Sequence, residues 1–357
     1  MRRADRLQWA EVAPWGADRC ILRKTMNVCI YPTGAWGTAM GLHLHRIGHT
    51  VTLVPFTTEE ALDMASAREN RAFLPGFSLP ADIQVGVELM PSLMEAELLI
   101  LAAPSQYLRS VCKGVRASLE KAWRLDAVLT LSKGLEETTY KLPADIVGEE
   151  LPQYAHGVLS GPTFASQVAE GQPSALVLGM EDAARAEALQ ESLSGAGLRI
   201  YRTEDVNGVE LGGCLKNVYA IAAGMCDGLG LRDNSKAALL TRALHEMVRL
   251  GRGCGGRSET FYGLSGFGDL FLTCNGRESR NRTFGEAVAK GESADELLAD
   301  GRTVEGYHTT RIFHSLCRER GIDAPILAEI HAVLFENKPV RDAMDALMRR
   351  EQKVEYA

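Results

Sequence analysis

The sequence predicts an α/β protein in which a mainly parallel sheet domain is followed by an all-helical C-terminal domain. From Val28 to about Tyr201, short aliphatic and β-branched runs alternate with helical patterns, as they do in βαβ units. After about Asp205 only helical patterns continue. The 357 residues are enough for two separate hydrophobic cores.

The expected strands and helices follow one another along the chain. Ligands of such sheets bind at the carboxyl ends of the strands, so we expect the site there, in a cleft beside the second domain. Strands are predicted at 27–31, 50–56, 97–105, 126–134, 156–163 and 174–180. Helices are predicted at 36–48, 57–70, 105–123, 181–195, 205–230, 235–255 and within 302–350.

The domain boundaries follow from these patterns. Residues 1–25 mix acids with arginines around a Pro-Trp-Gly break, which suits neither a signal nor a transit peptide. We expect them to be an N-terminal extension, with Met26 a candidate start. The sheet domain is predicted at 26–204 and the helical domain at 205–357.

The composition excludes several classes of function. A net charge of −7 gives no general attraction to nucleic acid or to anionic membranes, and no stretch suits membrane insertion. We therefore expect a cytoplasmic protein that binds no nucleic acid. The eight cysteines form no C-x-x-C pair and no ligand spacing with histidine, so we expect reduced thiols and no metal site.

The stretch NVCIYPTGAWGTAMG (27–41) has the layout of a dinucleotide-binding turn, with a strand, a glycine loop and a helix. Gly34 and Gly37 fill the second and third glycine positions, but Pro32 fills the first and removes a backbone N–H. The helix start after Gly34 still offers N–H groups to a phosphate, although a plain strand-to-helix loop is the alternative. Neither an acid nor an arginine ends the second strand, so NAD and NADP both stay open.

Two lysines stand where a charge is chemically useful. Lys133 ends a predicted strand, at the edge of the sheet where ligands bind. Lys216 lies beside Asn217 in a helix of small and apolar residues, where burial would lower its pKa and suit it to proton transfer. The alternative is a lysine that extends from the edge of the helix into solvent.

Two glycine-rich segments add polar groups. In SGPTFA (160–165), Gly161 would let a ligand approach the backbone and Thr163 offers a hydroxyl. The segment 263–288 supplies Asp269 and then a helix start whose side chains suit a phosphate dianion. An exposed basic loop is the alternative for this helix start, which consists of Ser279, Arg280 and Asn281.

Several blocks occur in the order of a known family. They are GAWGTA, FLPG, APS, SKGLE, SGPTFA, LGGCLKNVYAIAAGMCDGLG, GFGDLFLTC, SRNRTFG and VEGY. Through them the chain resembles the bacterial-type NAD(P)-dependent sn-glycerol-3-phosphate dehydrogenases. The resemblance implies a Rossmann-like domain at 26–204 and a substrate domain at 205–357. It also implies NAD(P)H-dependent, reversible reduction of dihydroxyacetone phosphate to sn-glycerol 3-phosphate, for glycerophospholipid synthesis.

The resemblance also implies a role for individual residues by their position. Lys216 would transfer the proton, Lys133 would touch the substrate, and Asp269 would orient Lys216 or bind the terminal hydroxyl. The implied substrate contacts are Lys133, Gly161, Thr163, Lys216, Asn217, Asp269, Ser279, Arg280 and Asn281. The implied contacts with NAD or NADP are Gly34, Ala35, Trp36, Gly37, Lys133, Ala165, Arg280 and Glu305.

Two departures from the family concern the cofactor. The family usually reads G-A-G-S-W-G, whereas this chain has Pro32 in place of the first glycine and Ala35 in place of the serine. They support a second hypothesis, a catalytically weakened member that binds a phosphorylated metabolite as a sensor or scaffold. A third hypothesis is an enzyme for another small phosphorylated hydroxy compound. The sequence also leaves a homodimer open.

Overall fold

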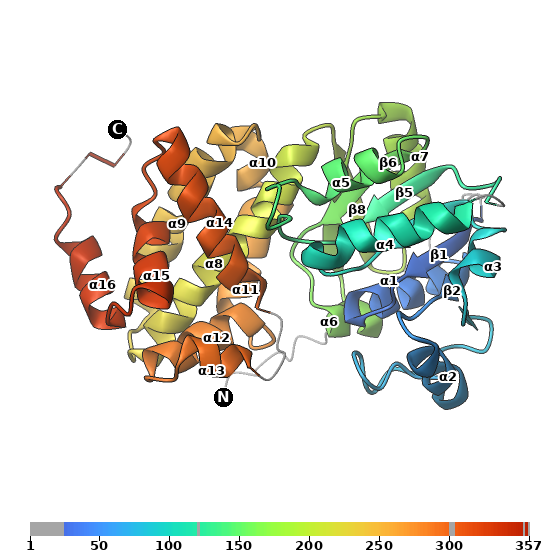
Figure 1. Cartoon of the computed structure of the whole chain (residues 1–357), viewed down its shortest axis with the longest axis horizontal. Helices are drawn as coiled ribbons and strands as arrows, with labels where there is room; N and C mark the ends of the chain where they lie inside the picture. The colour runs from blue at the N-terminus through green and yellow to red at the C-terminus, as the bar shows by residue number, and fades with distance from the viewer. Residues whose placement is uncertain (1–24, 120–121, 300–303, 353, 356–357) are drawn as a thin grey trace, which may run out of the picture.

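The computed structural model describes residues 25–119, 122–299, 304–352 and 354–355. The expected extension at 1–25 therefore lies outside the described residues, apart from Thr25. One half of the molecule is built on a sheet and the other on helices (Figure 1). This arrangement confirms the predicted fold class.

Eight strands form one sheet in the order β3, β2, β1, β4, β5, β6, β7, β8. The strands from β3 to β6 run parallel, whereas β7 pairs antiparallel with β6 and parallel with β8. The direction in which the sheet grows reverses between β1 and β4, where open α/β sheets bind ligands. The strands are β1 (Asn27–Tyr31), β2 (Thr50–Leu53), β3 (Gln84–Val85), β4 (Leu98–Leu101), β5 (Ala127–Thr130), β6 (Ala155–Ser160), β7 (Ser174–Met180) and β8 (Leu198–Thr203).

Helices cover both faces of the sheet because successive strand residues point to opposite faces. In β1, Val28 and Ile30 pack in the core with α1, α2, α6 and α7, whereas Cys29 packs in the core with α3, α4 and α5. The result is a three-layer domain. Its helices are α1 (Ala35–Arg46), α2 (Thr58–Ala67), α3 (Leu89–Leu93), α4 (Ser105–Ser118), α5 (Pro143–Glu150), α6 (Ala165–Glu170) and α7 (Ala183–Leu193).

The helix α8 (Val206–Gly228) starts on the sheet and continues as the central helix of the helical half (Figure 1). At its start, Val209 packs against Val158 of β6 and Val177 of β7. Further along, its residues form the core of the helical half. That half also contains α9 (Asp233–Gly253), α10 (Ser258–Tyr262), the π-helical turn η2 (Leu264–Gly268), α11 (Asp269–Asn275), α12 (Arg280–Ala289), α13 (Ala294–Leu298), α14 (Glu305–Arg320), α15 (Pro325–Phe335) and α16 (Val340–Met348).

The small residues of α8 allow a neighbouring helix of the same chain to approach very closely. A Cβ atom at Gly224 would collide with the carbonyl oxygen of Arg282 on α12, and one at Gly285 of α12 would collide with that of Ile221 on α8. The glycine-rich faces of α8 and α12 therefore pack against each other. These glycines therefore serve packing within one chain.

None of the helices in the described part of the chain combines the length and apolar character that crossing a membrane requires. Every cysteine within the described ranges is a free thiol. In the same ranges, no group of three or more histidine, cysteine or acidic side chains is arranged to hold a metal ion.

Candidate active site

The glycine turn leaves the start of α1 open. Gly34 is the N-cap residue of α1, no side chain caps the helix, and its first turn contains no acidic residue. A Cβ atom at Gly34 would meet no atom within 4 Å. The N–H groups and the positive end of the helix dipole therefore face open space, which fits the diphosphate of a dinucleotide.

Pro32 changes the turn without closing it. The Tyr31–Pro32 peptide bond is cis. Thr33 secures the turn, because its N–H donates to the carbonyl of Val54 at 3.0 Å and its hydroxyl donates to that of Ile30 at 3.0 Å.

The third glycine position of the motif keeps its packing role. A Cβ atom at Gly37 would lie 3.1 Å from both the Ala102 Cβ and the Ile30 Cγ2 atoms. Gly37 therefore lets α1 approach the sheet closely, as the last glycine of the motif is expected to do.

Asn70 is a support that the sequence analysis missed. Its side-chain amide donates to the carbonyl of Thr33 at 3.3 Å and to the hydroxyl of Thr38 at 2.8 Å. Asn70 is buried and follows α2, far from the glycine motif in sequence. No local pattern connects these segments, so only the fold could reveal the contact.

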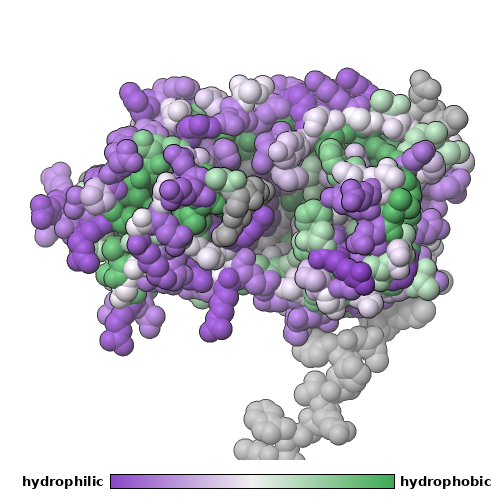
Figure 2. All heavy atoms as spheres, turned by 60° about the horizontal axis from the view of Figure 1, so that its bottom comes forward, coloured by the Kyte–Doolittle hydropathy of each residue, from purple (hydrophilic) through white to green (hydrophobic). Residues whose placement is uncertain are grey.

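Two lysines contact one carboxylate where the sheet half meets the helical half. On one face, the surface of the molecule is hollowed between these two halves (Figure 2). Lys133 Nζ, from the loop after β5, lies 2.6 Å from Asp269 Oδ2. Lys216 Nζ, on α8, lies 2.5 Å from Asp269 Oδ1. Asp269 is fully buried and Lys216 is 7% exposed, so the predicted burial of Lys216 is confirmed.

The surroundings of Lys216 change its proton affinity. Burial lowers the pKa of Lys216 to about 8, and the Asp269 carboxylate opposes part of that decrease. The nearby Lys133 ammonium lowers this pKa further. Lys216 therefore exchanges a proton more easily near neutral pH than an exposed lysine does.

Glu305 lies at the start of α14, close to the same cluster. Its carboxylate accepts a hydrogen bond of 3.0 Å from the side-chain amide of Asn217. Burial raises the pKa of Glu305, and the positive charges of Arg280, Lys216 and Lys133 oppose the increase. The structure thus brings these five predicted residues within electrostatic reach of one another.

Two of the three side chains at the start of α12 are already engaged. The Ser279 hydroxyl is the N-cap acceptor for the Arg282 N–H, at 3.2 Å. The Asn281 side chain donates to Asn217 at 3.0 Å and accepts from the Gly306 N–H at 2.9 Å. Arg280 is the third of these side chains. It is exposed, whereas Ser279 and Asn281 are buried.

Gly161 has a packing role in addition to the one expected from the sequence. We expected its missing side chain to make room for a ligand. Its φ angle is +147°, and a Cβ atom there would lie 3.0 Å from the carbonyl oxygen of Ala175 on β7. Packing against β7 therefore requires this glycine, and its carbonyl accepts hydrogen bonds from Lys133 Nζ at 3.3 Å and from the Thr163 hydroxyl at 3.4 Å.

Three of the predicted cofactor contacts lie on two neighbouring helices, α1 and α6. Ala35 and Trp36 are in the first turn of α1, and Ala165 begins α6, which packs beside α1. All three side chains are partly buried against the sheet core.

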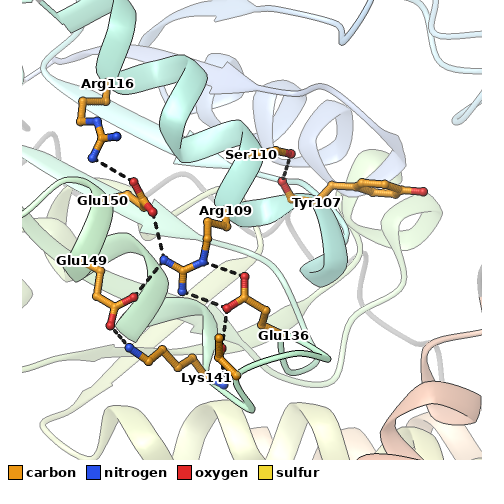
Figure 3. Close-up of polar contacts among 9 residues, drawn as sticks. Tyr107, Arg109, Ser110, Arg116, Glu136, Lys141, Glu149 and Glu150 are labelled. Atoms are coloured by element: carbon orange, nitrogen blue, oxygen red, sulfur yellow. Dashed lines mark hydrogen bonds and ion pairs between the residues drawn. The ribbon is translucent and has the colours of Figure 1, made fainter.

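Arg109 holds the Lys133 loop (residues 133–142), and sequence analysis missed it. Its guanidinium donates to both oxygens of Glu136, at 2.7 and 2.9 Å, and to Glu150 at 2.9 Å (Figure 3). Glu137, the next residue, forms an ion pair with Arg311 on α14. The loop is therefore tied to α4 of the sheet half and to α14 of the helical half.

A cavity of about 500 Å³ lies elsewhere, at the amino ends of β5 and β6. Its lining includes Asp126, His156 and Arg185, and it contains none of the predicted site residues. Because ligands of parallel sheets bind at the opposite edge, we place the site by chemistry rather than by volume.

The matches to family models cover both halves of the chain. The model described as NAD-dependent glycerol-3-phosphate dehydrogenase N-terminus matches residues 27–186. The corresponding C-terminus model matches residues 205–345.

Curated relatives and solved structures agree with these matches. Glycerol-3-phosphate dehydrogenase (NAD(P)+) of Thiobacillus denitrificans is 45% identical over 333 residues, which cover 93% of this chain and all of the relative. The protein of the same name from Desulfitobacterium hafniense is 40% identical over 334 residues, covering 92% of this chain and 93% of the relative. The crystal structure of glycerol-3-phosphate dehydrogenase from Coxiella burnetii superposes with a TM-score of 0.85 at 34% identity, covering 91% of this chain and 99% of that one.

Proposed function

The chain belongs to the NAD-dependent glycerol-3-phosphate dehydrogenase family, and we propose that it reduces dihydroxyacetone phosphate to sn-glycerol 3-phosphate with NADH or NADPH. The reaction is reversible, and its usual role in the family is glycerophospholipid synthesis. The observation that carries the proposal is the buried cluster of Lys216, Asp269 and Lys133, formed by residues of both halves.

Lys216 is proposed as the proton donor. The reduced nicotinamide, when bound, supplies the hydride for the substrate carbonyl carbon. Protonated Lys216 then donates a proton to the carbonyl oxygen as negative charge grows there. Its pKa of about 8 supports this role, since a pKa near the working pH lets the same group donate a proton in the reduction and accept one in the oxidation.

Lys133 and Asp269 are proposed to control charge and orientation. Asp269 accepts an ammonium on each carboxylate oxygen, so the two lysine charges exceed the single negative charge of this carboxylate. That excess positive charge favours a developing oxyanion. Asn217, Gly161 and Thr163 support the same region through their hydrogen bonds.

Arg280 is proposed as the phosphate contact. Its guanidinium offers forked donors, and the N–H groups at the start of α12 lie beside it. Ser279 and Asn281 would act through the helix geometry that they stabilise. Binding the phosphate there would hold the reacting carbon in position, with binding energy that comes from a part of the substrate remote from that carbon.

The first experiment is to mix the purified full chain with dihydroxyacetone phosphate and to follow the absorbance of NADH or NADPH. Turnover with either nucleotide is the expected result. If folded protein consumes neither nucleotide but binds the phosphorylated metabolite, the sensor hypothesis replaces the enzyme. Faster turnover of another phosphorylated hydroxy compound would instead change the substrate.

Three broader features of the protein are also proposed. We propose a cytoplasmic location, because the described cysteines are free thiols, and localisation of a tagged chain would test it. We also propose a domain boundary between residues 204 and 205, where α8 begins, testable by hydrogen exchange. A homodimer is the third, and light scattering of the purified chain would reveal it.

A further inference from the structure

The loop between β2 and α2 lies beside the glycine turn. The N–H of Val54 donates to the carbonyl of Ile30 at 2.9 Å, and the N–H of Thr33 donates to the carbonyl of Val54 at 3.0 Å. In dinucleotide-binding sheets, the end of the second strand faces the adenosine ribose, where a 2′-hydroxyl marks NAD and a 2′-phosphate marks NADP. The side chains of this loop therefore bear on the choice between the two.

Glu60 occupies the backbone donors of this loop. Its Oε2 atom accepts from the N–H of Phe56 at 3.1 Å and from that of Thr57 at 3.0 Å. The Thr57 hydroxyl accepts from the Glu60 N–H at 3.2 Å, which completes a capping box at the start of α2. Pro55 has no N–H, so positions 55–57 leave no free backbone donor for a phosphate.

The space beside the loop is acidic. A cavity of about 230 Å³ extends from Thr33 of the glycine turn and Pro55 of the loop toward α2 and the segment after it. One guanidinium, that of Arg71, lines it, and this group lies 3.7 Å from a Glu69 carboxylate oxygen. Four carboxylates line the same cavity, those of Glu59, Glu60, Asp63 and Glu69.

We propose that Glu60 makes this chain selective for NADH over NADPH. The inference rests on the proposed function, since it assigns the cofactor to the same site. A 2′-phosphate would bring a second anion against the Glu60 carboxylate, with the loop donors already engaged. A 2′-hydroxyl is neutral and can donate to Oε1 of Glu60, the oxygen that takes part in neither loop contact.

The test measures binding without substrate. The full chain is titrated with NADH and with NADPH, and the dissociation constants are obtained from nicotinamide fluorescence or calorimetry. NADH should bind at least about tenfold more tightly, which is about 1.4 kcal/mol. Glu60→Gln keeps an acceptor for the capping box and removes the charge, so it should tighten NADPH binding and bring the ratio toward one.

Two further variants complete the design. Glu191→Gln removes the same charge from an exposed position on α7, at the other end of the sheet, and should leave the ratio unchanged. Phe56→Arg adds a cation at an exposed loop position and should tighten NADPH binding even if Glu60→Gln fails to fold.

The outcomes separate the inference from the function on which it rests. Equal or tighter binding of NADPH by the unaltered chain would overturn the inference and leave the dehydrogenase intact. An unchanged ratio in folded Glu60→Gln would also overturn it, as would an unchanged ratio in Phe56→Arg if Glu60→Gln does not fold. Failure of the folded chain to bind either nucleotide would overturn the proposed function together with the inference.

Discussion

Lys216 Nζ lies 2.5 Å from Oδ1 of Asp269, and both groups are almost completely buried. Lys133 occupies the other oxygen of the same carboxylate. A buried lysine without such a partner would lose its proton more readily, because burial alone favours the neutral form. Asp269 therefore keeps Lys216 protonated at neutral pH and also fixes the direction of its ammonium group.

Replacing Lys216 by alanine should abolish most of the turnover. Loss of a general acid typically lowers the rate by about 10²- to 10⁴-fold. The dissociation constant of NADH should change little, because the open start of α1 is untouched. Lys113→Ala, at an exposed position on α4, is the matched control. Steady-state kinetics and nucleotide titration check both statements, and near-normal turnover in Lys216→Ala would remove its assigned role.

The rate of ketone reduction should fall as the pH rises above about 8. The reduction requires protonated Lys216, whose pKa is about 8 in the folded chain. Above that pH the protonated fraction decreases about tenfold per unit, while the reverse oxidation gains from the neutral amine. Asp269→Asn removes the charge that opposes the decrease in pKa, so it should move the inflection to lower pH. An inflection near the ordinary lysine pKa would contradict this prediction.

Arg109→Lys should lower kcat/KM by about 10- to 100-fold, because a small displacement of a positioned group costs that much. A lysine cannot contact both oxygens of Glu136, so the Lys133 loop should become less well fixed. Arg116→Lys is the control, since Arg116 pairs with Glu150 on α5 and not with the loop. Equal losses of kcat/KM in the two variants would indicate a purely structural effect.

Arg280→Gln should raise the KM for dihydroxyacetone phosphate by roughly 10- to 100-fold, the range of one lost charge-assisted hydrogen bond. The rate with unphosphorylated dihydroxyacetone should be the same in the variant and the unaltered chain, because that substrate has no phosphate to bind. Arg277→Gln removes a nearby exposed charge and serves as the control. A similar loss with both substrates would argue against a phosphate contact.

The sequence predicted the larger elements because their patterns are local. The alternation of apolar runs and helices required the α/β sheet, and the small neighbours of Lys216 indicated its burial. The strand β8 was missed because only Leu198 and Ile200 are buried in it, between the exposed Arg199, Tyr201 and Arg202, so its apolar run is too short to stand out in the sequence.

The supporting contacts could not be predicted in the same way. Arg109 and Glu136 are 27 residues apart, and Asn70 and Thr33 are 37 apart, so no spacing rule joins them. Gly161 stood out in the sequence as a place where a ligand could approach the backbone, but its close packing against the backbone of β7 could not be predicted there. Pairings of this kind depend on how the strands are ordered, which is a property of the whole fold.

Because α8 is continuous, it sets a fixed distance between the sheet and Lys216. Val209 rests on the sheet, and Lys216 follows seven residues later, which is about 10.5 Å along a helix axis. An α-helix does not stretch, so Lys216 donates its proton at a constant distance from the sheet. Arg280 and Glu305 are carried by separate helices, α12 and α14. Mutations in α12 can thus adapt the protein to a longer or shorter substrate without moving Lys216, whereas the charge of Glu305 on α14 acts on the pKa of Lys216 itself.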